Sequence, residues 1–129
     1  MDIKRARVFV VEDESVMSTF ILNSLRRIGI LDQHAFKEGS AAMREVARLK
    51  PDLIITDVHM EPVGGMEFVR ELRAHPDAGI SHTKVIFLSA DASAATVSEV
   101  LPLGIVGYIV KPPSLTALTA KIEWALKDR

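Results

Sequence analysis

The chain has 129 residues, about the length of one globular domain, so we expect a single domain over residues 1–129. Hydrophobic residues make up 48% and charged residues 26% of the sequence, which excludes an intrinsically disordered chain and allows a buried core. Because there is no cysteine, disulfide frameworks and thiolate zinc sites are excluded. A net charge of −1, with apolar runs much shorter than a membrane span of roughly 18 residues, predicts a cytoplasmic protein that binds neither nucleic acid nor membrane.

Short apolar runs rich in β-branched residues alternate with amphipathic helical patterns along the chain. In chain order we expect a strand at Val8–Val11, a helix at Ser15–Ile28, a weaker strand at His34–Phe36, a helix at Ser40–Leu49, a strand at Leu53–Thr56, a helix at Gly65–Ala74, a strand at Val85–Leu88, a short helix at Ala94–Leu101, a strand at Tyr108–Val110 and a helix at Leu115–Leu126. The strands are continuously apolar, as in sheets that helices cover on both faces. This alternation predicts an α/β fold, a doubly wound five-stranded parallel sheet with right-handed crossovers.

Local signals indicate how the helices begin, end and face the core. Gly29 follows the first helix as a stop, and Ser40 is predicted to cap the second helix at its amino end. The first helix is expected to bury an apolar face that begins at Val16. Arg70 and Arg73 are predicted to lie on the solvated face of the third helix.

Chemically reactive side chains follow four of the predicted strands. Glu12 and Asp13 follow the first strand, Asp57 the third, Ser89 the fourth and Lys111 the fifth. In an open parallel sheet the carboxyl ends of the strands meet at one edge, which is where such folds bind ligands. We therefore expect three carboxylates, one hydroxyl group and one ammonium group to lie together.

This set of groups favours phosphoryl chemistry. Three clustered carboxylates repel one another, and a hard divalent cation such as Mg²⁺, bound by oxygen ligands, relieves that repulsion. An ammonium group and a hydroxyl group suit the oxygens of a phosphoryl group, and a carboxylate beside them can act as the nucleophile to give an aspartyl phosphate. Taken alone, Asp13 would more simply be a helix cap and Lys111 a solvated charge, so the prediction depends on their joint placement.

Five spaced motifs resemble the receiver domain of a two-component response regulator, of the single-domain, CheY-like kind. They are Val-Val-Glu-Asp-Glu at 10–14, Asp-Leu-Ile-Ile-Thr-Asp at 52–57, Met60 with Pro62 and Gly65, Leu-Ser-Ala at 88–90 and Gly-Tyr-Ile-Val-Lys-Pro at 107–112. The resemblance covers essentially the whole chain in the order and spacing of the family. It implies a (βα)5, flavodoxin-like fold with strand order 2-1-3-4-5 and no output domain.

The resemblance implies a metal site around the phosphoacceptor. Asp57 is expected to accept the phosphoryl group. Asp13, Asp57 and the backbone carbonyl of His59 are expected to bind Mg²⁺ (or Mn²⁺), with Glu12 assisting through water. In the family's strand order the first and third strands are neighbours, which implies that Asp13 lies beside Asp57.

The resemblance also implies which residues handle the phosphoryl group and respond to it. Ser89 is expected to bond the group and Lys111 to pair with it, so that Asp57, Ser89 and Lys111 form the catalytic set. Tyr108 is expected to change rotamer when Ser89 is drawn in, although an ordinary half-buried core aromatic is the alternative. The Lys111–Pro112 bond is expected to be cis.

The sequence departs from the family pattern in two places. Glu61 separates Met60 from Pro62, where the family commonly has Pro directly after the Met, so the loop after the third strand is expected to follow a different path. Gly104–Ile105 replaces the usual Gly-Ala before the fifth strand, and Pro102 lies just upstream. These residues predict a shortened or bent fourth helix.

Two more residues flank the expected phosphoryl site. His59 lies two positions after Asp57, and Asp91 lies two positions after Ser89. In the family these positions influence how readily water attacks the phosphoryl group, so we expect the two side chains to set the lifetime of the phosphorylated state. The alternative is that both are solvated loop residues.

These features predict a stand-alone response regulator of a two-component phosphorelay. The expected phosphodonor is a phosphohistidine on a sensor histidine kinase or a histidine phosphotransfer protein. Phosphorylation of Asp57 is expected to change the binding of an unknown downstream protein, or the phosphoryl group is passed on. We expect no enzyme activity beyond self-phosphorylation from small donors and autodephosphorylation, and a monomer or a phosphorylation-dependent dimer.

Two other classes of protein share parts of the pattern. A pseudo-receiver that serves only as a protein-binding module has usually lost one or more of the site groups, all of which are present here. Haloacid-dehalogenase-type phosphatases use Mg²⁺ and a strand-end Asp nucleophile. They typically need a second acid two positions later, where this chain has His59.

Overall fold

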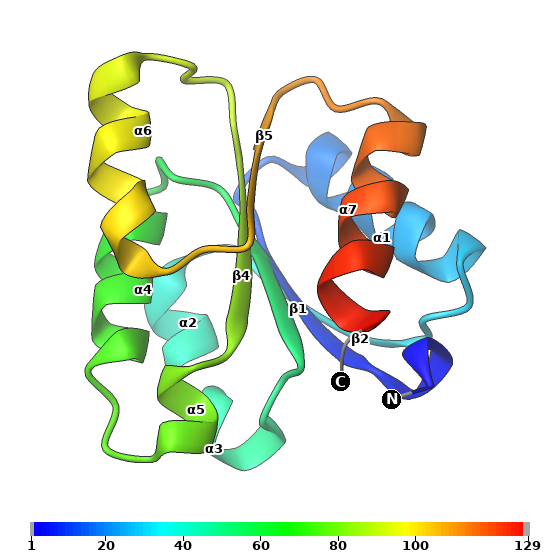
Figure 1. Ribbon diagram of the computed structural model, residues 1–129, viewed down its shortest axis with the longest axis horizontal. Coiled ribbons are helices and arrows are strands. Elements are labelled where there is room, and N and C mark those ends of the chain that lie inside the picture. Colours follow the sequence, from blue (N-terminus) through cyan, green and yellow to red (C-terminus); the bar gives the residue numbers. More distant parts are fainter. Residues whose placement is uncertain (1, 128–129) are drawn as a thin grey trace.

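Five parallel strands form one sheet between two layers of helices in the computed structural model, which describes residues 2–127 (Figure 1). The strands are β1 (Arg7–Val11), β2 (Asp32–Phe36), β3 (Leu53–Thr56), β4 (Lys84–Ser89) and β5 (Gly107–Val110). Their order across the sheet is β2-β1-β3-β4-β5, and each pair of neighbours is parallel. The predicted fold and strand order are confirmed, and every predicted strand is present within two residues of its expected ends.

Two helices cover one face of the sheet and the remaining helices lie against the other (Figure 1). The helices are α1 (Ser15–Arg27), α2 (Gly39–Met43), α3 (Val46–Leu49), α4 (Gly65–Arg73), α5 (Ala78–Ser81), α6 (Ala94–Val100) and α7 (Leu115–Lys127), with 3-10 turns η1 (Ile3–Arg5) and η2 (Leu101–Leu103). α1 and α7 pack on the first face, while α2, α4 and α6 pack on the second. No helix within residues 2–127 is long and apolar enough to cross a membrane.

The strands are continuously apolar because alternate side chains enter two different cores. Val8 and Val10 of β1 pack against α1 and α7, whereas Phe9 and Val11 pack against the helices of the opposite face, and all four are fully buried. β2 (Asp32–Phe36) is the exception, since it lies at the edge of the sheet and its residues are only partly buried or exposed.

The single helix predicted at Ser40–Leu49 is wrong, because this segment forms the two short helices α2 and α3. The prediction that Ser40 is the cap is also wrong. The carboxylate of Glu38 accepts the backbone N–H of Ser40 at 2.6 Å, so the helix begins one residue earlier, at Gly39. A side chain two residues upstream therefore determines where this helix starts.

Two expectations about helix faces are also wrong. Val16 is 80% exposed, because the first turn of α1 borders an open hollow beside Pro112 and Pro113. Arg73 is not on a solvated face. At the end of α4 its guanidinium group donates to the backbone carbonyls of Ser81 and Thr83, at 2.8 and 2.7 Å, and Leu103, at 2.7 Å.

The fourth predicted helix is short, as expected. α6 ends at Val100, and Pro102 lies inside the 3-10 turn η2 that follows. Val100 is fully buried against the sheet, while Leu101 is 61% exposed. The chain then enters β5 through Gly104, whose φ of +68° lies in the left-handed region that glycine adopts without strain.

Candidate functional site

The carboxyl edge of the sheet brings the strand-end residues together, as the sequence predicted. β1 and β3 are neighbours, with Val11 opposite Thr56, and the backbone N–H of Asp57 donates to the carbonyl of Val11 at 3.1 Å. Glu12 and Asp13 therefore emerge beside Asp57. One oxygen of each of these three carboxylates lies within 4.8 Å of one oxygen of the other two.

Lys111 reaches from the end of β5 into this acidic cluster. Its Nζ lies 2.7 Å from Oε1 of Glu12 and 2.8 Å from Oδ2 of Asp57, and its side chain is only 12% exposed. Burial by itself lowers the pKa of Lys111, but the hydrogen bonds and the charges of the two carboxylates outweigh it and raise that pKa. The lysine is therefore held as an ammonium group.

Glu12 is the most deeply buried of the three carboxylates. It is 3% exposed, and its pKa is raised above the ordinary Glu value. Burial is the main cause and the charge of Asp57 adds to it, while the hydrogen bonds from Lys111 and from the backbone N–H of Glu14 oppose it. One ammonium group does not neutralise three carboxylates.

The cluster has the donor chemistry that a hard divalent cation needs. All its ligand atoms are carboxylate oxygens, and with Lys111 counted the group keeps a surplus of negative charge. Asp13 is exposed, and it does not cap α1, because the cap position is Glu14, whose own side chain makes no capping hydrogen bond. The residues present therefore fit Mg²⁺.

Ser89 lies at the end of β4, directly beside this cluster. It is 1% exposed, and its Oγ accepts the backbone N–H of Asp91 at 3.1 Å. The carbonyl of Ser89 accepts the backbone N–H of Lys111 at 2.8 Å, so the same pair of strands positions the hydroxyl and the ammonium group. Within the described part of the chain, no acceptor takes the hydroxyl proton of Ser89.

Tyr108 is linked to Ser89 through the loop after β4. Its ring packs against Phe87, with centroids 6.5 Å apart, and its hydroxyl group donates to the carbonyl of Asp91. The backbone N–H of the same Asp91 donates to Ser89. Asp91 therefore connects the buried hydroxyl of Ser89 to the half-buried Tyr108.

His59 and Asp91 contact each other across the site. Nε2 of His59 lies 3.0 Å from Oδ2 of Asp91, which joins the loop after β3 to the loop after β4. The hydrogen bond from Thr96 Oγ1, at 2.6 Å, is the main reason that the pKa of Asp91 lies far below its usual range, followed by bonds from Ser93 and His59. Sequence reasoning selected both residues, but it did not predict their contact and missed Thr96.

Gly65 is a further positioning residue, which the sequence showed only as part of a motif. A Cβ at this position would lie 1.9 Å from the backbone oxygen of Asp57, so any other residue would displace that backbone. The backbone N–H of Gly65 also donates to the carbonyl of Val58 at 2.9 Å. The first turn of α4 thus rests directly on the segment that presents Asp57.

Two peptide bonds near the site are cis. The Lys111–Pro112 bond is cis, as the resemblance implied. The Glu61–Pro62 bond is also cis, which we did not predict, and it lies in the loop after β3 where the sequence departs from the family pattern.

Comparison with known proteins identifies one family. The sequence pattern of the response regulator receiver domain matches residues 8–123. The chemotaxis protein CheY of Pseudomonas aeruginosa is 30% identical over 117 residues, which cover 91% of this chain and 93% of the relative. The chemotaxis protein CheY-3 of Vibrio cholerae is 28% identical over 120 residues, 93% and 91% of the two chains. The solved structure of the chemotaxis response regulator CheY4 of Vibrio cholerae superposes with a TM-score of 0.82 at 25% identity, covering 94% of this chain and 98% of that one.

Proposed function

The chain belongs to the response regulator receiver domain family of two-component signalling, and on that premise we propose that it is a stand-alone response regulator that accepts a phosphoryl group on Asp57. The observation that carries the proposal is the carboxylate of Asp57, held at the open edge of the sheet beside the ammonium group of Lys111 and two further carboxylates. The family match and the relatives of similar length support a receiver domain over residues 1–129.

In the proposed transfer the donor is a phosphohistidine on a sensor histidine kinase or a histidine phosphotransfer protein. A carboxylate oxygen of Asp57 forms a bond to phosphorus while the phosphorus–nitrogen bond breaks, and the electron pair of that bond stays on the imidazole. Lys111, already 2.8 Å from Asp57, pairs with a phosphoryl oxygen, and Ser89 donates its free hydroxyl proton to another. These three residues form the proposed catalytic set.

We propose that Asp13, Asp57 and the backbone carbonyl of His59 hold Mg²⁺ or Mn²⁺, with Glu12 assisting through water. This assignment is supported by the oxygen-only donor set and by its surplus negative charge. When bound, the cation supplies charge neutralisation at the oxygens of the transferring group. Asp13 presents its carboxylate to solvent, where it would be accessible to the cation.

The proposed switch runs from Ser89 to Tyr108. When Ser89 turns toward the phosphoryl group, its hydroxyl oxygen no longer accepts the backbone N–H of Asp91 in the same geometry. The carbonyl of the same Asp91 accepts the hydroxyl group of Tyr108. A shift of this loop therefore changes the position of the Tyr108 side chain beside α6, which alters the surface offered to a downstream protein.

The proposed lifetime control depends on the contact between His59 and Asp91. This pair spans the open side of the site, where water reaches the phosphoryl group. We expect His59→Asn and Asp91→Ala to change the dephosphorylation rate measured after removal of the donor. Unchanged rates in both variants would leave the two residues as loop contacts only.

We propose that the phosphodonor docks on the apolar hollow beside α1. Val16 is 80% exposed, and with Met17, Phe20, Pro112 and Pro113 it lines a hollow of about 190 Å³ next to the position of Lys111. Such an exposed apolar surface at the rim of a reactive site fits a partner protein that must bring its phosphohistidine to Asp57. The downstream protein stays unidentified, and a monomer or a phosphorylation-dependent dimer in the cytoplasm is proposed.

The experiment that tests the phosphoacceptor is intact-mass spectrometry after incubation with acetyl phosphate and Mg²⁺. We expect a single phosphoryl adduct in the wild type, and no adduct in Asp57→Asn or in the presence of EDTA. No adduct in the folded wild type would instead support a pseudo-receiver that only binds protein. Steady turnover of phosphate esters would support an aspartate-nucleophile phosphatase.

A further inference from the structure

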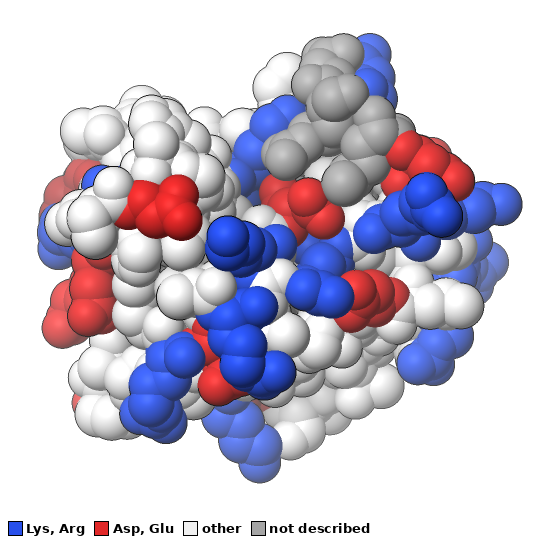
Figure 2. Space-filling model, turned by 90° about the horizontal axis from the view of Figure 1, so that it is seen from below, with Lys and Arg blue, Asp and Glu red and all other residues white. Residues whose placement is uncertain are grey.

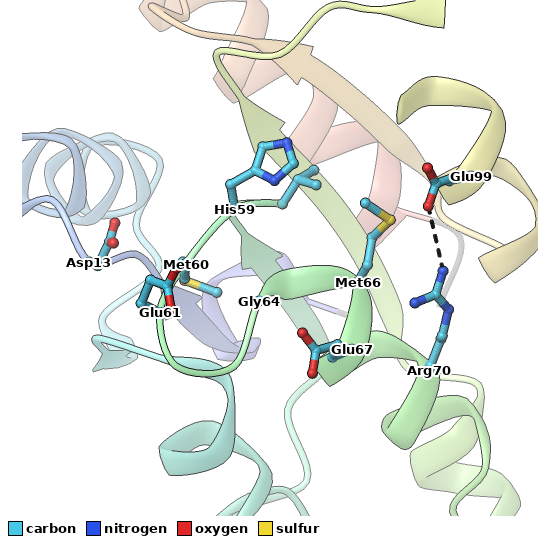
Figure 3. Close-up of a pocket in the computed structure, with 10 residues that line it drawn as sticks. Asp13, His59, Met60, Glu61, Gly64, Met66, Glu67, Arg70 and Glu99 are labelled. Carbon is cyan, nitrogen blue, oxygen red and sulfur yellow. Dashed lines mark ion pairs between the residues drawn. The ribbon is translucent and has the colours of Figure 1, made fainter. Parts of the chain in front are cut away.

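A groove lies beside the acidic cluster, between the loop after β3 and the helices α4 and α6 (Figure 3). It encloses about 360 Å³, the volume of a long side chain with space to spare, and it is open to solvent. Asp13 and His59 lie at the end nearest the phosphoacceptor. Arg70 of α4 and Glu99 of α6 lie at the opposite end.

The walls of the groove carry more acidic than basic groups. Figure 3 shows the carboxylates of Asp13, Glu61 and Glu67 placed around the loop and the first turn of α4, with Arg70 paired to Glu99 at a distance of 3.9 Å. The opposite charges of Arg70 and Glu99 offset each other. Among residues 2–127 no cation forms an ion pair with Asp13, Glu61 or Glu67, so the groove keeps an unbalanced negative charge.

The floor of the groove is apolar and adaptable. Val58 is 2% and Met60 7% exposed, and Met66 at the start of α4 is partly buried. Methionine side chains are unbranched and polarizable, so a surface that contains them accommodates differently shaped partners. The groove therefore combines an apolar floor with a rim of carboxylates.

We propose that this groove receives a lysine or arginine side chain of a protein partner. These side chains have an apolar stem and a cationic head, so the stem lies on Met60 and Met66 while the head reaches Glu61 and Glu67. A small hydrated cation would gain nothing from the methionines, and an acidic segment would be repelled. The apolar floor together with the unbalanced charge therefore selects a basic protein segment.

The groove does not depend on the phosphoryl chemistry, although the two sites are neighbours. Asp13 belongs both to the metal cluster and to the rim of the groove. A basic side chain bound there lies close to the negative charge that phosphorylation of Asp57 adds, and binding and phosphorylation would then strengthen each other by the same factor. Docking in the unphosphorylated protein tests the groove separately from the proposed phosphoacceptor.

The methionine methyl groups give a direct readout. The chain has five methionines, of which Met60 and Met66 lie in the groove, while Met17 and Met43 lie elsewhere in the structure. Protein labelled with ¹³C at the methionine methyl groups is titrated with N-acetylarginine methylamide in saturating Mg²⁺, so that the metal cluster is already filled. N-acetylcitrulline methylamide, which has nearly the same shape but no charge, is the matched control probe.

We expect saturable shifts of the Met60 and Met66 signals with the arginine probe and none at Met17 or Met43. The citrulline probe should bind about tenfold more weakly, which corresponds to about 1.4 kcal/mol. Glu61→Gln and Glu67→Gln should each weaken binding of the arginine probe. Glu71→Gln should not, because Glu71 is exposed on the same helix but does not line the groove.

Three results would overturn the proposal. One is equal binding of the arginine and citrulline probes. Another is equal shifts at all four methionines, which indicates unspecific association. The third is tighter binding of spermidine combined with no binding of the arginine probe, which assigns the groove to a polyamine. Unchanged Met17 and Met43 signals in each Gln variant show that the variant is folded.

Discussion

The amino and carboxyl edges of the sheet differ in how their charged side chains are paired. At the amino edge Nε of Arg7 donates to Asp32 at 2.9 Å, and Nζ of Lys84 donates to the carbonyl of Ala125 at 2.6 Å. The face seen from this side shows Lys and Arg side chains with Asp and Glu beside them (Figure 2). At the carboxyl edge the ammonium group of Lys111 pairs with Glu12 and Asp57, while Asp13, the third carboxylate of the cluster, has no ion pair among residues 2–127. At the amino edge these charged groups each have a partner, whereas the carboxyl edge concentrates negative charge.

The pKa shifts of one carboxylate at each edge express this difference. Burial is the largest influence on Asp32 and acts to raise its pKa, but the hydrogen bonds and charges of Arg7 and His34 together lower that pKa. Burial is also the largest influence on Glu12, where it prevails and raises the pKa. The charge of Asp32 therefore stabilises the fold at the amino edge, whereas the buried charge of Glu12 at the carboxyl edge opposes folding and suits a ligand.

The largest effect is expected where backbone and site meet, at Gly65. Gly65→Ala places a methyl group 1.9 Å from the oxygen of Asp57, so we expect a loss of about 3 kcal/mol or more in the free energy of unfolding, together with loss of the phosphoryl adduct. Urea unfolding and intact mass measure the two effects. Gly79→Ala is the control, since its new methyl group would meet only the side chain of Asp77, at 3.2 Å. Equal losses in both variants would contradict the special position of Gly65.

The second prediction compares Lys111 at the carboxyl edge with Lys84 at the amino edge. Lys111→Met leaves Glu12 and Asp57 without their cation in a nearly buried setting, and we expect a loss of about 3 kcal/mol in the free energy of unfolding at neutral pH without metal. Lys84→Met removes only a hydrogen bond to the end of α7, with an expected loss of about 1 kcal/mol. Urea unfolding of both variants checks the ratio. A smaller loss for Lys111→Met than for Lys84→Met would reverse the comparison.

A third prediction concerns the arginine that binds backbone carbonyls near the amino edge. Arg73→Lys cannot keep the bonds to Ser81, Thr83 and Leu103 together, so we expect a loss of about 2 kcal/mol. Amide hydrogen exchange should accelerate in α5 and η2 in particular. Arg70→Lys on the same helix is the control, because its exposed ion pair at 3.9 Å contributes little. Uniform acceleration across the protein would argue against a local role of Arg73.

The smallest expected effect is the pH dependence of the stability that the Arg7–Asp32 ion pair contributes. Because folding lowers the pKa of Asp32, the pair stabilises the protein above the ordinary Asp value of 3.8, and this stabilisation is lost as pH falls through the lower folded value. Both partners are about 40% exposed, so we expect less than about 1 kcal/mol. The stability of the wild type should exceed that of Asp32→Asn at about pH 6, and the difference should shrink as pH falls below 3.8 toward the lower folded value. If the difference in free energy of unfolding between wild type and Asp32→Asn stayed constant over this pH range, Asp32 would not contribute to the pH dependence of stability.

The sequence was sufficient to predict the sheet and which strand-end side chains lie close together. The continuous apolar runs required two covered faces, and strand ends at one edge bring Asp13, Asp57 and Lys111 together in any parallel sheet with this order. These features depend on the periodicity of apolar residues along the chain and on the strand order. Both can be inferred from one sequence.

The contacts that depend on side-chain direction were not predictable in this way. The break between α2 and α3 and the exposed position of Val16 arise from the ends of elements, where periodicity carries little information. The carbonyls that bind Arg73 come from two segments distant in sequence from each other. The contact between His59 and Asp91 likewise joins two loops. Such contacts follow from packing, which a pattern of residue types does not specify.

The most direct test of the contrast between the two edges compares one carboxylate from each. We would measure the urea unfolding of Asp13→Asn and Asp32→Asn in metal-free buffer and in Mg²⁺ at about 100 times its dissociation constant, where binding adds about 2.7 kcal/mol. We predict that metal-free Asp13→Asn is at least as stable as the wild type and gains little from Mg²⁺, while Asp32→Asn is less stable and keeps the full gain. A destabilised Asp13→Asn that keeps the gain of the wild type would contradict the account.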